Sequence, residues 1–556
     1  MDFFKPSVPV NLQGAHLAGT QLASVDLSSA NLQSADLTSA NLSDADLRHS
    51  NLKNGKLCFA ILSKAKFNGA FLSETDLAGA DVTDAEFWAN DFTKANLQGL
   101  DLRGKNFNKS VLIGANLAAA NLSGVDLNSK DLTGTILVGS NLADANLSGV
   151  DLSSKDLTGT NLVGVNLSKA NLSEVDLRGK DLTGTSLTGA ILTNTNLSGT
   201  NLAGKDLMGV NLTGADLTET NLARTNLTGV DLSNKDLTGT NLAGANLTKA
   251  NLAGVDLRGK DLTGTSLAGA ILANTNLSGT NLAGKNLIGV NLAGADLTET
   301  NLAGANLTGV DLSRKDFTRT NLAGANLTKA NISGVNLRGK DLAQTNFSEA
   351  NLADTSFTGA ILAGANLSGV NLSSKDLTET NLAGANLTSA NLSGVDLSGK
   401  DLTQTNFSEA NLANTNLTST ILTGSNLSRV DLSRKDLTGT NLAGVNLTQA
   451  NLTGVDLNGK NLTQTNLTGA SLAGTNLACA NLTDANLSGA YLRDSRFQGT
   501  VLTRTNLSYA NLTGCDITNA KDLDSSNLSG VTMSESGRNK LRLFFSDQAE
   551  NSSGEE

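Results

Sequence analysis

The sequence predicts a solenoid, a chain wound into stacked coils of short repeated units, and three observations support this prediction. An apolar residue recurs every five positions from Leu12 to Ile517 without a break. The residue two positions before it is usually small, and the residue directly before it is usually Asn or Asp. Long segments recur almost unchanged further along the chain. Phe, Tyr and Trp make up only 3% of the 556 residues, a bias that calls for a repeat search before a motif search.

The apolar residue, termed position i from here on, has a period that fits neither an α-helix nor a β-strand, which repeat about every 3.6 and 2 residues. The chain must therefore turn a corner within each unit. We expect positions i and i−2 to share the interior and positions i−1, i+1 and i+2 to face water. Frequent Gly, Asn and Asp suit such corners. Only two Pro occur, as expected if most amides bond to a neighbouring coil.

The length of one coil follows from the copied segments. LRGKDLTGTSL begins at Leu177 and again at Leu257, and two near-identical segments begin at Lys340 and Lys400. These two steps share the divisor 20, or four pentapeptides, which favours four faces per coil. A shorter copy step, from Gly124 to Gly149, moves the pattern by one face.

The unit A-[DN]-L-x-x, in runs such as NLAGANLTGVDL, resembles the pentapeptide-repeat family over residues 12–517. The resemblance implies an all-β fold, a right-handed quadrilateral β-helix with four pentapeptides per coil and about 25 coils. At a strand spacing of about 4.8 Å, such a stack would be on the order of 120 Å long.

We divide the chain into an N-terminal cap (1–11), the repeat β-helix (12–520), a C-terminal cap with a short helix (521–545) and a polar tail expected to be disordered (546–556). The boundary at 520 follows from the register of position i, which slips by one residue at Lys521.

Both ends of the solenoid need covering, because an open coil exposes its apolar interior. Leu541, Phe544 and Phe545 fall on one face of the predicted C-terminal helix. This helix either plugs the last coil or joins two copies in a homodimer, as the C-terminus of some family members does. Phe3 and Phe4 are expected to cover the other end.

Composition and motifs argue against several classes of protein. The net charge of −11 argues against a nucleic-acid partner, which needs clustered Lys and Arg. No apolar run approaches the roughly 18 residues of a membrane helix, and the N-terminus lacks a signal-peptide core. We therefore expect no membrane contact, and a location in the cytoplasm or in a particle assembled there.

No catalytic, metal or cofactor site is expected either. The three cysteines lie far apart without a CxxC pair, and no catalytic or phosphate-binding motif occurs. Pairs of carboxylates recur only because the repeat places Asp at i−1, and without a cleft they form no acid–base site.

Lysine at the inward position i−2 is the main departure from the repeat. An ammonium inside an apolar core is costly unless it is paired. We expect each stem to pack inside while the ammonium reaches solvent, a carboxylate or a backbone carbonyl of a neighbouring coil. Its role is either to shape the coil or to mark regularly spaced attachment sites. The fourteen residues are Lys105, Lys130, Lys155, Lys180, Lys205, Lys235, Lys260, Lys285, Lys315, Lys340, Lys375, Lys400, Lys435 and Lys460.

Outward apolar residues are the candidate partner contacts, because they interrupt an otherwise polar surface. The aromatic candidates fall on three different faces of an irregular stretch, which favours local packing. The isoleucines share one face, which suits contact with a partner. The candidates are Phe59, Phe71, Trp88, Ile361 and Ile421.

The sequence thus predicts a non-enzymatic structural or interaction protein: a rigid scaffold or spacer that binds protein partners along its faces in a larger assembly, such as a lattice or capsid shell. The alternative, which the family resemblance implies, is a DNA mimic that inhibits or protects a type II topoisomerase. Lys and Arg interrupt the Asp rows here, as at Lys130-Asp131, and this weighs against mimicry. A supercoiling assay distinguishes the two hypotheses.

Overall fold

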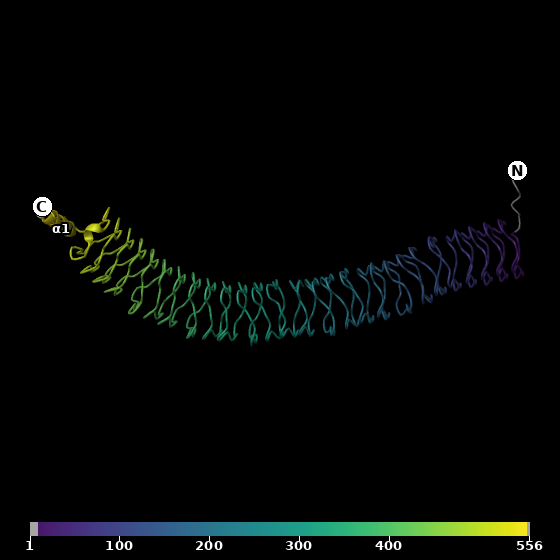
Figure 1. Cartoon of the computed structure of the whole chain (residues 1–556), viewed down its shortest axis with the longest axis horizontal. Helices are drawn as coiled ribbons and strands as arrows, with labels where there is room; N and C mark the ends of the chain where they lie inside the picture. The colour runs from purple at the N-terminus through teal and green to yellow at the C-terminus, as the bar shows by residue number, and fades with distance from the viewer. Residues whose placement is uncertain (1–8, 553–556) are drawn as a thin grey trace. The chain divides into compact units, whose positions relative to one another are not determined.

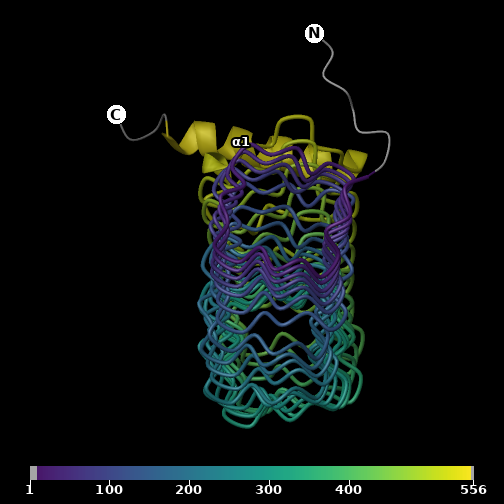
Figure 2. The same cartoon turned by 90° about the vertical axis from the view of Figure 1, so that its right-hand side faces the viewer.

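The computed structural model describes residues 9–552, and the chain divides into two compact units, Met1–Thr275 and Asn276–Glu556. Within each unit, successive coils follow one another along the chain (Figure 1). Parallel β-bridges join residues one coil apart, such as Asn31 with Asn51 in the first unit and Asn386 with Asn406 in the second. The first coils overlie one another in Figure 2. Each unit is a right-handed quadrilateral β-helix with four pentapeptides per coil, as the sequence predicts.

The backbone amides of one pentapeptide, residues 385–389, explain the composition of the repeat. Three of these amides donate to carbonyls of the neighbouring coils. The Ala385 amide closes a turn on the Leu382 carbonyl at 3.0 Å. The Thr388 amide donates to Oδ1 of Asn386 at 3.2 Å. Asn or Asp at i−1 is therefore more than a polar surface residue, since its side chain satisfies the one amide that has no backbone acceptor.

The core of each unit consists of the side chains at positions i and i−2. Position i is buried at every unit from Leu27 to Ile517. In the first unit, four buried phenylalanines pack together, and the ring centroid of Phe87 lies 5.4 Å from those of both Phe67 and Phe92. This aromatic cluster fills the interior of the stretch that is irregular in sequence.

Corners place position i+2 in the left-handed region of backbone space whether or not the residue is glycine. Gly384 has a φ of 67° and Ser389 has a φ of 54°. Glycine is frequent at this position because it adopts such φ values without steric penalty.

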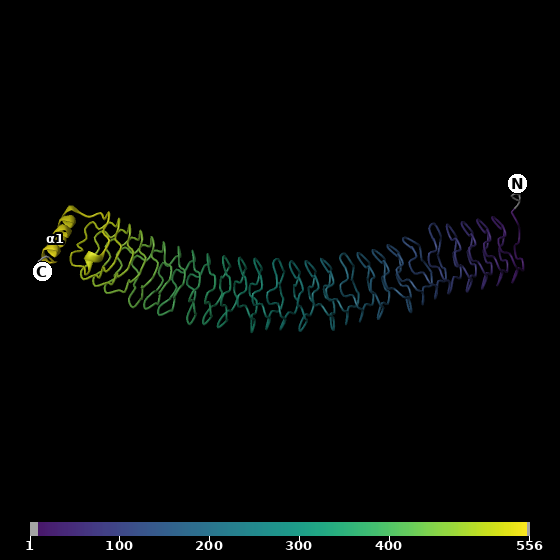
Figure 3. The ribbon, with the colours of Figure 1, turned by 45° about the horizontal axis from the view of Figure 1, so that its top comes forward.

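The C-terminal end changes register and then becomes helical. Val501 pairs with Lys521 in the regular register, whereas Asn506 pairs with Asn527, one position later than the repeat would place its partner. The extra residue falls between Lys521 and Leu523, directly before a 3₁₀ turn, η1 (Leu523–Ser525). The helix α1 (Glu535–Ser552) lies at the end of the second unit (Figure 3).

Helix α1 is longer than the sequence predicts. Residues 546–552 are helical and not a disordered tail, because Gln, Ala and Glu in this segment favour helix. Residues 553–556 lie outside the described part of the chain.

The N-terminal end also differs from its predicted boundary. The Asn31 amide bonds to the Val10 carbonyl, so the first coil already includes Val10, which the predicted boundary leaves in the cap. Phe3 and Phe4 lie outside the described residues, and their covering role stays a prediction.

Candidate interaction surfaces

The lysines at position i−2 bond to the backbone of the preceding coil, which confirms the expected escape from the core. Thirteen of them donate from Nζ to a carbonyl of that coil, and Lys285 is also engaged in an interaction. Lys155 bonds to the Thr135 carbonyl at 3.1 Å and Lys435 to the Thr415 carbonyl at 3.0 Å. The other bonds are made by Lys105, Lys130, Lys180, Lys205, Lys235, Lys260, Lys315, Lys340, Lys375, Lys400 and Lys460.

Twelve of these thirteen ammonium groups bond to a carbonyl that elsewhere accepts an amide of the ladder between coils, whereas Lys460 bonds to the Leu437 carbonyl, which also accepts a turn amide. One face further on from Lys155, the Asn161 amide donates to the Ser140 carbonyl at 3.0 Å. At Lys155, the equivalent carbonyl binds the ammonium, and Asp156 takes part in no β-bridge in the described structure. Adjacent coils therefore separate at this point. We use the term lysine notch for the opening between two coils at a lysine of position i−2.

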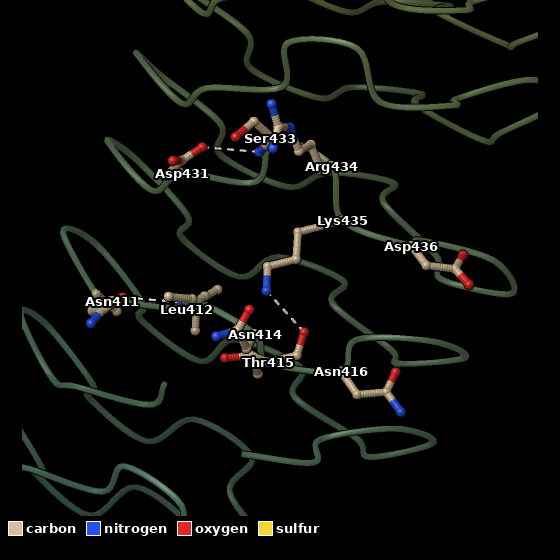
Figure 4. A pocket seen from close by; sticks show the side chains of 12 residues that line it. Asn411, Leu412, Asn414, Thr415, Asn416, Asp431, Ser433, Arg434, Lys435 and Asp436 are labelled. Atoms are coloured by element: carbon tan, nitrogen blue, oxygen red, sulfur yellow. Dashed lines mark hydrogen bonds between the residues drawn. The ribbon is translucent and has the colours of Figure 1, made fainter. Parts of the chain in front are cut away.

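Cavities open at several lysine notches. One of them, about 600 Å³, lies at Lys435 in the second unit (Figure 4). In this notch Lys435 extends toward the Thr415 carbonyl, and Asp436 points away from it. Burial lowers the pKa of Lys435, and the nearby carboxylate of Asp431 opposes that shift. Sequence reasoning predicted the lysine contacts but missed the notches, since the opening depends on a broken ladder bond.

Replacing Lys400 by Ala is expected to change stability by no more than about 1 kcal/mol, because Ala fits position i−2 and the Thr380 carbonyl can then accept the Asp401 amide. Lys400→Met is the matched control. It keeps the stem but leaves that carbonyl unpaired, which costs about 1–3 kcal/mol. Thermal unfolding of both variants measures the difference. An Ala variant less stable than the Met variant would contradict this account.

The outward aromatic candidates differ in whether their rings contact neighbouring residues of the chain. Phe59 is 68% exposed, but its ring covers Gly79 of the next coil so closely that a Cβ there would lie 2.7 Å from it. Lys109 Nζ lies 5.0 Å from the centre of the Trp88 ring. Phe71, 54% exposed, has no such ring contact among the described residues. Local packing thus engages Phe59 and Trp88 and leaves Phe71 as the freest of the three.

The isoleucine candidates lie on the surface of the second unit at position i−1. Ile361 is 42% and Ile421 is 45% exposed. The surfaces of the two units carry further exposed apolar side chains that the sequence analysis did not name. These are Met208, Ile288, Tyr491 and Tyr509, among others.

The C-terminal candidates lie on α1. Leu541 and Phe544 are part-buried and Phe545 is exposed, while Leu543, which was not predicted, is 63% exposed. Lys540 Nζ lies 2.8 Å from Oδ2 of Asp516 and ties the helix to the last coil. The hydrogen bond from Lys540 lowers the pKa of Asp516 to about 2.

The described residues offer no cluster of three or more His, Cys, Asp or Glu that would suit a metal ion. All three cysteines are free, and burial raises the pKa of Cys58 and of Cys515 to about 11, so both thiols are poor nucleophiles. No helix within residues 9–552 is both long and apolar enough to span a bilayer.

The family model for pentapeptide repeats matches this chain in 21 segments, most of them overlapping, from residues 10–44 to residues 495–536. The chain therefore belongs to the pentapeptide-repeat family. No curated protein matches it.

Solved structures of other pentapeptide-repeat proteins are similar to parts of it. HetL from Nostoc sp. strain PCC 7120, described as involved in heterocyst differentiation regulation, is 27% identical over 52% of this chain and 91% of its own, with a TM-score of 0.12. QnrB1, a plasmid-mediated fluoroquinolone resistance protein, is 17% identical over 45% of this chain and 97% of its own, with a TM-score of 0.15. Rfr23 from the cyanobacterium Cyanothece 51142 is 22% identical over 32% of this chain and 88% of its own, with a TM-score of 0.10.

Proposed function

We propose that this protein is a non-enzymatic scaffold that binds protein partners along its faces, in the cytoplasm or in a particle assembled there. The observation that carries the proposal is the pair Ile361 and Ile421 on one face of the second unit. Each replaces the Asn or Asp that the repeat places at i−1, and so gives up the bond that caps its turn. An apolar side chain that weakens its own turn and stays exposed is best explained by a contact with another molecule.

The two isoleucines are placed identically relative to the lysine notches. The Ile361 amide donates to the Lys340 carbonyl at 2.9 Å, and the Ile421 amide donates to the Lys400 carbonyl at 3.0 Å. The same pair of features, a notch and an exposed isoleucine, thus recurs three coils later. Three coils correspond to roughly 14 Å. A partner that itself repeats at this distance, such as a lattice or shell, can contact both.

The double variant Ile361→Asn/Ile421→Asn tests the proposal. Asn at these positions can accept the amides of Ala363 and Thr423, as Asn381 accepts that of Ala383 at 3.0 Å, so stability should be unchanged or up to about 1 kcal/mol higher. We expect the variant to stop co-sedimenting with large assemblies from the cells that make it. A variant that sediments like the wild type would contradict the proposal, because its fold is intact.

Charge does not favour the alternative role as a DNA mimic. Arginines neutralise the Asp rows in the first unit, since Arg103 pairs with Asp101 at 2.6 Å and Arg178 with Asp176 at 2.7 Å. A surface that imitates DNA needs continuous negative charge, which these pairs interrupt.

We also propose that α1 joins two copies of the chain. The exposed side chains of Leu543 and Phe545 support this role, whereas a helix that only plugs the last coil has no need of them. Light scattering on the full chain distinguishes the roles. A dimer that Leu543→Lys converts to a monomer supports joining, and a monomeric wild type contradicts it.

A further inference from the structure

One cavity of the second unit stands out by its charge. This cavity, about 440 Å³, is lined by Arg314, Lys315, Arg338 and Lys340, with Asp316 as its only carboxylate. Four other cavities along the described chain each carry equal numbers of acidic and basic side chains. An excess of three positive charges in one opening of a chain with a net charge of −11 needs an explanation.

The excess arises partly because Arg338 lacks the partner that equivalent arginines have. Arg178 and Arg258 follow the sequence Asp-Leu, and each forms a double hydrogen bond with that Asp. Arg338 follows Asn-Leu, so Asn336 stands where the carboxylate would be. No ion pair of the Arg338 guanidinium is found among the described residues, so its planar set of donors is available to a ligand.

The remaining cations are held around the same opening. The stem of Arg314 passes over Gly334 of the next coil, where its Cγ would lie 3.3 Å from an added Cβ. Lys340 uses one proton on the Thr320 carbonyl at 3.2 Å. Lys315 uses one proton on the Ala295 carbonyl of the coil before it, at 3.0 Å, and also lines the neighbouring cavity beside Asp311. Each ammonium has two further protons.

The carboxylates near the notch are already engaged. Oδ1 of Asp316 accepts the amide and the hydroxyl of Thr318, at 2.8 and 2.6 Å. Asp376, outside the lining, has its pKa lowered mainly by hydrogen bonds from Thr378 and only in small part by the charge of Arg338. A carboxylate keeps its charge when it accepts hydrogen bonds from Thr, and the charge of Asp316 also interacts with Lys340. Asp316 therefore offsets one of the four cations, and an excess of three positive charges remains in the lining.

We propose that this notch, lined by Arg314, Lys315, Arg338 and Lys340, binds the phosphate group of a small molecule. A guanidinium matches the oxygens of a phosphate in pairs, and the lysines add point charges. Two negative charges on the ligand suit the excess of positive charge better than the single charge of a carboxylate. The volume lies within the range of small-ligand sites, about 300–1,000 Å³. A nucleic acid is disfavoured, because the acidic chain around the notch repels a long polyanion.

The next notch along the second unit supplies a matched control. Lys375 and Lys400 occupy the same places as Lys315 and Lys340, but Ser374 and Ser398 stand where the arginines are. The double variant Arg314→Ser/Arg338→Ser therefore gives the first notch the polar lining of a notch that the chain already folds. Asn336→Asp leaves all four cations in place but restores the carboxylate that pairs with the guanidinium at Arg178 and Arg258.

Calorimetric titration of the full chain at low salt with inorganic phosphate, and separately with phenyl phosphate, tests the proposal. We expect one saturable site, with affinity reduced at least about tenfold in both the double-serine variant and Asn336→Asp. Asn461→Asp, which adds the same charge at another notch and restores the residue usual after these lysines, should bind like the wild type. Tighter binding of phenyl phosphate identifies an ester as the ligand, and tighter binding of inorganic phosphate identifies the free ion.

Two results would overturn the proposal. One is a wild-type chain that binds neither probe. The other is a phosphate affinity equal to that of the wild type in the double-serine variant, in Asn336→Asp and in Asn461→Asp, since the phosphate would then bind outside this notch. Circular dichroism of each variant shows that its fold is retained.

Discussion

Phe87→Ala is expected to lower the local free energy of unfolding around residues 60–110 by about 3–5 kcal/mol. Phe87 is 1% exposed, and its ring contacts those of Phe67, Phe92 and Phe107. Coils of a solenoid contact only their neighbours, so the loss should stay local. Hydrogen exchange should accelerate at least about a hundredfold in this stretch and remain unchanged in the second unit.

Phe87→Leu is the control for this prediction. Leucine is the usual residue at position i and keeps most of the buried surface, so the loss should fall to about 1–1.5 kcal/mol. An equal loss of unfolding free energy in Phe87→Ala and Phe87→Leu would mean that the aromatic cluster does not stabilise the irregular stretch.

Ser389→Pro is expected to destabilise the coils around it by more than about 3 kcal/mol. The φ of Ser389 is 54°, whereas proline fixes φ near −65°. Proline also removes the amide that donates to the Ser408 carbonyl at 2.9 Å. Limited proteolysis should cut the variant near residue 389 at a protease concentration that leaves the wild type intact.

Ser389→Gly isolates the backbone effect in this second prediction. Glycine keeps the amide and adopts positive φ without penalty, so the variant should resist proteolysis like the wild type. Cleavage of the glycine variant near residue 389 would show that the side chain, not the corner geometry, holds this coil.

Much of the fold follows from the sequence because one five-residue rule applies along the chain. The inward place of position i, the coil length of four pentapeptides and the register slip at Lys521 could all be read from spacing. The capping role of Asn386 could not, since it depends on which amide the backbone leaves without an acceptor.

The surface was less predictable than the core. The sequence places Lys435 inward, but only the structure shows that its ammonium replaces a ladder amide and opens a notch. The availability of Arg338 depends on one exchange of Asp for Asn two residues earlier. That signal was present in the sequence, but it has meaning only once Arg178 is seen paired with Asp176.

Site-specific photo-crosslinking tests the central claim, that the outward isoleucines contact a protein partner. A photoreactive amino acid replaces Ile361, Ile421 or, as a control, the exposed Asn371 on a different face of the second unit, in the cells that make the protein. The account predicts that one protein of discrete mass is cross-linked from positions 361 and 421 and not from 371. Equal cross-linking from all three positions, or none from any, would contradict it.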